Sequence, residues 1–109
     1  MIFKSLKICL HLLSVTLFIF ILGCNQESTD ERYNRLIETA KNYNAQGKWE
    51  EARITLQTAI DEKPKEADGY FQLAEVLVRS QRIGPAVENY RSALNYNPKH
   101  REARYHLAT

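Results

Sequence analysis

The sequence predicts an all-α protein in which an apolar leader precedes an array of helical hairpins. Apolar residues recur at helical spacing in the polar part of the chain, and this pattern repeats with a period of about 34 residues. Two prolines, Pro64 and Pro98, are separated by the same interval. We therefore expect a leader over residues 1–23, a polar linker over 24–30 and a helical array over 31–109.

The leader has the layout of a secretory signal. A short basic start up to Lys7 is followed by an apolar stretch from Ile8 to Leu22 that carries no formal charge. The stretch is shorter than the roughly 20 residues that span a bilayer as a helix. Two interpretations remain, a cleaved export signal and an uncleaved anchor, and the abrupt change to polar residues at Asn25 favours the first.

The end of the leader, Ile21-Leu22-Gly23-Cys24, resembles the lipobox of bacterial lipoproteins. The resemblance implies that Cys24 receives a diacylglycerol thioether, that the chain is cut before it, and that further acylation (a palmitate-type chain) follows. More than one acyl chain gives stable anchoring. Because Asn25 follows the cysteine where inner-membrane retention uses Asp, the resemblance implies the periplasmic face of the outer membrane in cells that have one.

The charge balance argues against a nucleic-acid partner. The whole chain has 15 Lys and Arg against 13 Asp and Glu, and removal of Lys4 and Lys7 with the leader leaves no net charge. Proteins that neutralise phosphates carry a basic excess.

The first predicted hairpin covers about residues 33–66. Ser28 and Glu31 form a capping-box signature for its first helix. Gly47 marks the turn, and Pro64 ends the second helix because proline cannot continue the hydrogen-bond ladder. Each helix carries an apolar stripe at i, i+4 and i+7: Leu36, Ala40 and Tyr43 in the first, and Ala52, Leu56 and Ala59 in the second.

The second predicted hairpin covers about 67–100, and a partial third unit covers 101–109. Gln81 takes the turn place of Gly47, at a cost of roughly 1 kcal/mol if its backbone is left-handed. Gly84 and Pro85 suit a cap and a first helical residue. A shift by one repeat pairs Ala40 with Ala74, Ala52 with Ala86, Ala59 with Ala93 and Leu73 with Leu107, and we expect Ala40, Ala52, Ala74 and Ala86 to let helices approach closely.

The pattern resembles the tetratricopeptide repeat, whose length is also about 34 residues. It reads Leu36, Ala40, Tyr43, Gly47, Trp49, Ala52, Leu56, Ala59 and Pro64, then Tyr70, Leu73, Ala74, Leu77, Ile83, Ala86, Tyr90, Ala93 and Pro98, with a third unit begun at Glu102 to Ala108. The resemblance implies a protein-binding array whose first helices line a concave face. It places six candidate partner-binding residues there: Ile37, Lys41, Phe71, Glu75, Arg79 and Tyr105.

Ile37, Phe71 and Tyr105 are in register at the repeat interval, and two interpretations of them remain. They form an apolar strip that anchors a peptide, or they pack against neighbouring helices. The third unit has no polar closing helix, and we expect its apolar side at Tyr105, Leu107 and Ala108 to be exposed.

No catalytic constellation, metal-ligand spacing or cofactor motif is recognisable, so we expect no enzyme activity. His100 and His106 have no partner at metal spacing and are expected to face solvent on a helix. The predicted function is a membrane-anchored interaction scaffold or assembly factor of the cell envelope. The alternative is a fragment or structural subunit of a larger repeat protein, completed by further repeats or by self-association through the third unit.

Overall fold

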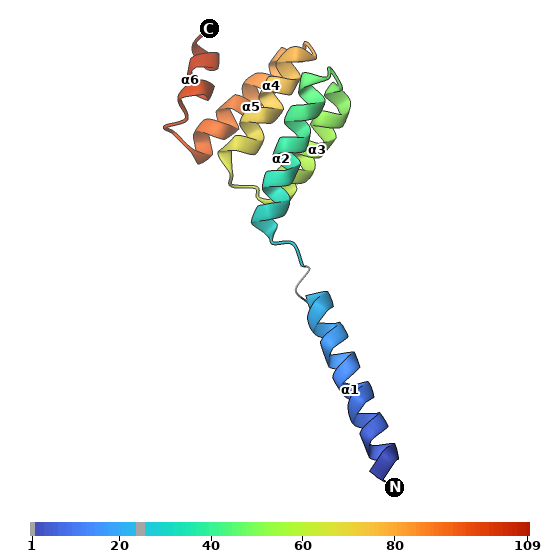
Figure 1. Ribbon diagram of the computed structural model, residues 1–109. Coiled ribbons are helices and arrows are strands. Elements are labelled where there is room, and N and C mark those ends of the chain that lie inside the picture. Colours follow the sequence, from blue (N-terminus) through green and yellow to red (C-terminus); the bar gives the residue numbers. More distant parts are fainter. Residues whose placement is uncertain (1, 24–25) are drawn as a thin grey trace.

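The protein is all-α, as predicted, in a computed structural model that describes residues 2–23 and 26–109 (Figure 1). The described residues contain no strand. The helices are α1 (Ile2–Gly23), α2 (Thr29–Ala45), α3 (Trp49–Glu62), α4 (Ala67–Arg79), α5 (Ile83–Tyr96) and α6 (Arg101–Ala108).

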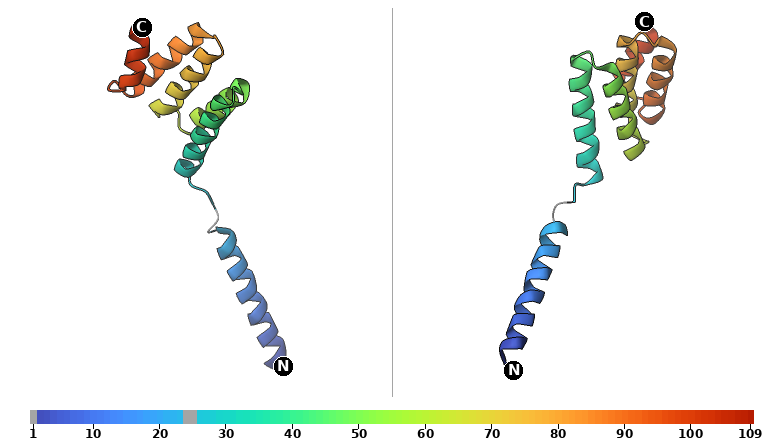
Figure 2. Two further views of the ribbon diagram at one scale, coloured as in Figure 1. Left: turned by 45° about the horizontal axis from the view of Figure 1, so that its top comes forward. Right: turned by 90° about the vertical axis from the view of Figure 1, so that its right-hand side faces the viewer.

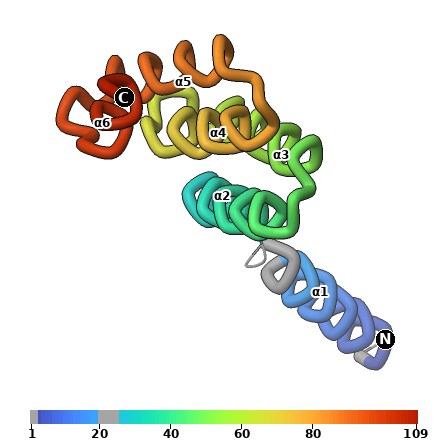
Figure 3. Tube along the Cα trace, turned by 90° about the horizontal axis from the view of Figure 1, so that it is seen from above, coloured from blue at the N-terminus to red at the C-terminus, as the bar shows by residue number. Residues whose placement is uncertain are grey.

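Helices α2 to α6 form two hairpins and one further helix, α6. Helix α2 pairs with α3, α4 pairs with α5, α3 packs against α4, and α6 packs against α5 (Figures 1 and 2). Viewed from above, each hairpin follows the previous one along the array (Figure 3). The hairpin array expected from the sequence is therefore the observed architecture.

The helix bounds repeat with the interval of the sequence pattern. Both ends of α5 lie one repeat interval after the corresponding ends of α3. Helices α2 and α4 end one such interval apart, and α4 and α6 begin one interval apart. The loops repeat as well, because the Tyr70 hydroxyl donates to the Pro64 carbonyl at 2.7 Å and Arg104 Nη2 donates to the Pro98 carbonyl at 2.6 Å.

Helix α1 lies outside this packing (Figure 1), and its apolar side chains are exposed between Phe3 and Ile19. Over the described ranges, no helix is both long and apolar enough to cross a membrane.

The first helix of the array begins with the predicted capping box. Ser28 Oγ accepts the Glu31 N–H at 3.2 Å, and Glu31 Oε2 accepts the Ser28 N–H at 3.1 Å. These bonds satisfy two amides at the start of α2, and Asp30 and Glu31 complement the positive end of the helix. The helix starts at Thr29, inside the stretch expected to be linker.

Small residues make the core thin and tightly packed, as the sequence predicted. Ala40, Ala52, Ala74 and Ala86 are at most 1% exposed, and Leu56 between them is completely buried. The other buried apolar residues are Tyr33, Ile37, Ala59, Ile60, Ala67, Leu73, Val76, Leu77, Tyr90, Ala93 and Ala103. Packing of this kind leaves little room for a larger side chain at the alanine positions.

The two hairpin turns have the same backbone geometry. Gly47 has φ +73° and Gln81 has φ +63°. The Lys48 N–H donates to the Tyr43 carbonyl at 2.9 Å, and the Arg82 N–H donates to the Leu77 carbonyl at 2.8 Å. The left-handed conformation considered for Gln81 is therefore confirmed.

The prediction for the start of α5 was wrong by two residues. Arg82 is the N-cap and the helix begins at Ile83, so Gly84 and Pro85 lie in its first turn. The tight turn at Gln81 reverses the chain early enough for the helix to start there. Pro85 is tolerated because amides of the first turn have no partner within the helix.

Replacing Gln81 by Gly should stabilise the protein by about 1 kcal/mol, since glycine adopts positive φ without the Cβ penalty. The matched change is Gly47→Ala, which should destabilise it by about the same amount. A Cβ at Gly47 meets no atom within 4 Å, so only the backbone conformation is tested there. Urea denaturation measures both. Equal midpoints for wild type and Gln81→Gly would contradict the strain assigned to this turn.

Tyr33 should make the protein sensitive to alkali. Its side chain is buried and its hydroxyl has no hydrogen-bond partner among the described residues. Burial, followed by the nearby Asp68 carboxylate, raises the pKa of Tyr33 to about 12. The neutral phenol is thus favoured in the folded state, and its contribution to stability is complete below pH 10 and is lost between about pH 10 and pH 12.

Tyr33→Phe should therefore raise stability by about 1 kcal/mol at pH 8, because an unsatisfied hydroxyl is removed. The variant should also lose less stability than wild type between pH 8 and pH 11.5, by about 2 kcal/mol. Urea denaturation at the two pH values gives both numbers. Parallel losses in the two proteins would show that Tyr33 ionises freely in the fold.

Candidate interaction surface

The first helix of each hairpin, α2 and α4, and the following helix α6 form the candidate surface, which we call the α2–α4–α6 face. Side chains connect its helices. Helix α2 contacts α4, and His106 of α6 lies 3.5 Å from Glu75 of α4 between Nε2 and Oε1. All six residues predicted to bind a partner come from these helices.

The three residues predicted to form an apolar strip have three different environments. Ile37 is 4% exposed and belongs to the core, so it offers almost no surface to a partner. Phe71 is half-buried against the core, whereas Tyr105 is 67% exposed. Tyr105 is the most exposed of the three and lies on α6, which packs against fewer helices than α2 or α4 does. Ile37 therefore packs against neighbouring helices, and of these three residues only Tyr105 is freely accessible to a partner.

The charged candidates come from helices of the same face but do not form one cluster. Lys41 Nζ lies 2.9 Å from Glu38 Oε1. This hydrogen bond to Glu38 raises the pKa of Lys41, and Asp68 on α4 adds to the effect from across the face. Arg79 is exposed in the last turn of α4, and Glu75 is half-buried beside α6.

The centre of the face is an aromatic and histidine cluster that the sequence did not reveal. The Phe71 ring lies between three others, with centroids 4.7 Å from His100, 5.9 Å from Tyr90 and 6.2 Å from His106. His106 stacks on Tyr90 at 5.2 Å with the planes 5° apart, and Tyr105 meets His106 edge-on at 5.7 Å. The cluster joins α4, α5 and α6.

Glu75 is the polar centre of this cluster. The Tyr90 hydroxyl donates a short hydrogen bond to Glu75 Oε1, the same oxygen that faces His106. Tyr90 is 3% exposed. Burial and then the hydrogen bond to Glu75 raise the pKa of Tyr90 far above its ordinary value. A carboxylate shared by a phenol and an imidazole on different helices holds the three helices in register.

The histidines differ from expectation. His100 was predicted to face solvent on a helix, but it is the N-cap of α6 and its side chain is only 14% exposed. Its Nδ1 accepts the Ala103 N–H at 3.3 Å. His106 is exposed on one side, as predicted, and covers Tyr90 with the other. The one sequence signal for the position of His106 was the repeat register. It makes His106 the equivalent of Gln72, a half-buried residue of the same face.

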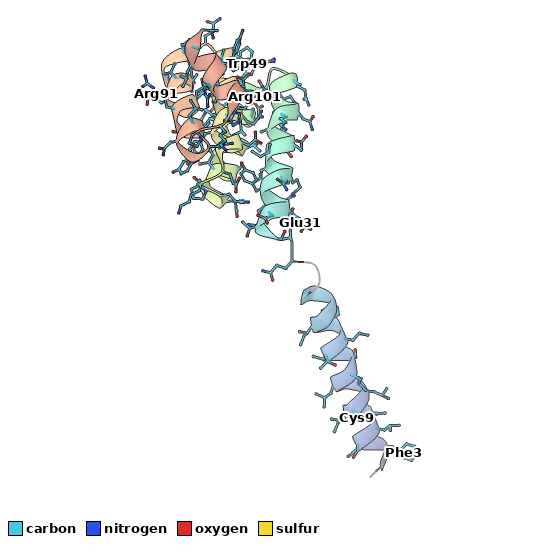
Figure 4. All side chains as sticks on the ribbon, turned by 90° about the vertical axis from the view of Figure 1, so that its left-hand side faces the viewer. Phe3, Cys9, Glu31, Trp49, Arg91 and Arg101 are labelled. Carbon is cyan, nitrogen blue, oxygen red and sulfur yellow. The ribbon has the colours of Figure 1, made fainter. Side chains whose placement is uncertain are left out.

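A second group of exposed apolar residues lies beside the turns of the two hairpins. Trp49 and Ile83, which begin the second helix of each hairpin, are 42% and 56% exposed, and Val78 before the second turn is 40% exposed. In Figure 4, Trp49 lies at the turn end of the first hairpin, and Glu31, at the start of α2, lies at the other end.

Within the part of the chain that the structure describes, His, Cys, Asp and Glu residues form no group of three that could hold a metal ion. Cys9 is an exposed free thiol on α1. The proposed lipidation site, Cys24, lies outside the described residues.

No family model matches the chain, and no curated protein matches it significantly.

Proposed function

We propose that this chain is a lipid-anchored interaction scaffold or assembly factor of the bacterial cell envelope. The helical array would be of the tetratricopeptide type and would bind a protein partner on its α2–α4–α6 face. Helix bounds and loop hydrogen bonds that recur at the repeat interval support the family assignment. The leader ending in Gly23-Cys24 supports the anchor.

The observation that carries the proposed binding site is the exposure of Tyr105 beside the half-buried aromatic cluster. Tyrosine supplies a large contact area with a polar end and is enriched among residues that dominate binding energy. Phe71 and His106 pack together beside it, and the carboxylates of Glu75 and Glu102 lie next to the two histidines of the cluster. A surface with an apolar centre and a charged rim is typical of protein interfaces.

The binding site is tested by capture from membrane extract with the tagged full chain in detergent. Tyr105→Ala should reduce recovery of a discrete partner by tenfold or more, as loss of an interface aromatic does at about 2 kcal/mol. Tyr96→Ala is the control, because Tyr96 is an exposed tyrosine on α5. Equal recovery with both variants would place the site elsewhere.

Self-association is the second candidate, favoured by the same exposed face of α6. Because an array stabilises each repeat through its neighbours, a second copy could cover Tyr105 and the half-buried Leu107. Analytical ultracentrifugation of the full chain in detergent distinguishes the two. A dimer that Tyr105→Ala dissociates supports self-association, and a monomer supports a different protein as partner.

The anchor predicts a defined amino terminus for the mature protein. Mass spectrometry of protein purified from membranes should find a chain that begins at Cys24 and carries diacylglycerol. Cys24→Ser should abolish both the modification and the cleavage, whereas Cys9→Ser should change neither. A chain that begins at Met1 with an unmodified Cys24 would overturn the proposed anchor.

A further inference from the structure

Helix α6 has little apolar surface with which to hold itself on the array. Ala103 is its only buried residue, and Leu107 is half-buried. The helix spans Arg101–Ala108, and a histidine near each of its two ends contributes to its attachment to the α4–α5 hairpin.

His100 supports the start of α6 in its neutral form. The Ala103 N–H donates to Nδ1, and a ring nitrogen accepts a hydrogen bond only when it carries no proton. Protonation at Nδ1 removes this cap and places a positive charge at the positive end of the helix. Glu102 Oε2, 3.3 Å from the same nitrogen, is the acid that would face the new proton, while α4 presents the uncharged ring of Phe71.

His106 supports the last turn in its protonated form. Its Nε2 faces Glu75 Oε1 of α4 at 3.5 Å, and its ring stacks on Tyr90 of α5. On α6 itself, Tyr105 meets the ring edge-on and Glu102 lies one turn earlier. A proton on His106 would turn the contact with Glu75 into a charge-assisted bond and add a cation near the negative end of the helix.

We propose that α6 is a histidine-controlled clasp on the α4–α5 hairpin. Neutral His100 and protonated His106 each favour the docked helix, so protonation of the two rings changes the docking of α6 in opposite directions. Their balance sets how often α6 is folded and docked. The docking of α6 can be measured on the chain alone, without any partner.

Two variants separate the opposing responses. His100→Asn keeps an acceptor at the N-cap but removes its titration, so only His106 responds to pH. His106→Gln leaves only His100 to respond to pH. Amide hydrogen exchange of the full chain in detergent, read at residues 103–107 and corrected for intrinsic rates, reports the docking of α6. The amides of α3 serve as an internal reference for global unfolding.

Between pH 7.5 and pH 5, protection of α6 relative to α3 should rise about fivefold in His100→Asn and fall about fivefold in His106→Gln. The double variant should show no change in this ratio. Shifts in the same direction in the two single variants would overturn the clasp. So would a flat response in either single variant or a pH-dependent ratio in the double variant.

Discussion

Ala86→Trp should unfold the second hairpin, at a cost of about 3 kcal/mol or more. Ala86 is 1% exposed in the first turn of α5, where that helix packs closely against α4. An indole cannot enter such a contact without pushing the helices apart, because overpacking of a dense core forces backbone shifts. Ala52→Trp should act in the same way in the first hairpin, since Ala52 occupies the equivalent place in α3.

Circular dichroism with thermal and urea denaturation measures the effect. The control is Ile83→Trp, three residues earlier on α5, where the side chain is 56% exposed and an indole has room. The control should melt close to wild type. Equal melting temperatures for Ala86→Trp and Ile83→Trp would show that the helices do not approach at Ala86.

Leu56→Ala should cost about 3–4 kcal/mol. Leu56 is completely buried, in α3, which packs against both α2 and α4. Truncation removes apolar contacts and leaves a cavity in the middle of the array, where both hairpins limit the collapse that could fill it. Because stability in such arrays is carried by neighbouring units, the second hairpin should lose protection together with the first.

Ile54→Ala on the same helix is the matched control, because Ile54 is 54% exposed and its truncation opens no cavity. Its cost should stay below about 1 kcal/mol. Urea denaturation of both variants gives the comparison. A loss below about 1 kcal/mol for Leu56→Ala would mean that α3 is not the central layer of the core.

The hairpins could be predicted from the sequence because their determinants are local or strictly periodic. The Ser28 and Glu31 pair started a helix, Gly47 marked a turn whose shape Gln81 repeats, and the buried alanines recurred at fixed spacing. Each of these features acts within one helix or between adjacent helices. The start of α5 was misplaced because Gly84 and Pro85 are compatible with several positions in a first helical turn.

The candidate surface could be predicted only in outline, because the exposure of a residue depends on how side chains from different helices pack around it. Ile37, Phe71 and Tyr105 share one register in the sequence but range from buried to exposed along the array. The contacts that join His106 to Tyr90 and Glu75 are made by single side chains from three different helices. A periodic sequence pattern cannot predict such contacts, since each is made by a different pair of residue types.

The proposed binding of a partner at the α2–α4–α6 face is tested most directly by photo-crosslinking in intact cells. A photoreactive phenylalanine analogue at position 105 should give one discrete cross-linked protein. The same analogue in place of Arg91, which is exposed on α5, should not give that product (Figure 4). A discrete product from position 105 alone is the predicted result. The same product from both positions, or a product from position 91 alone, would contradict the assignment of the surface.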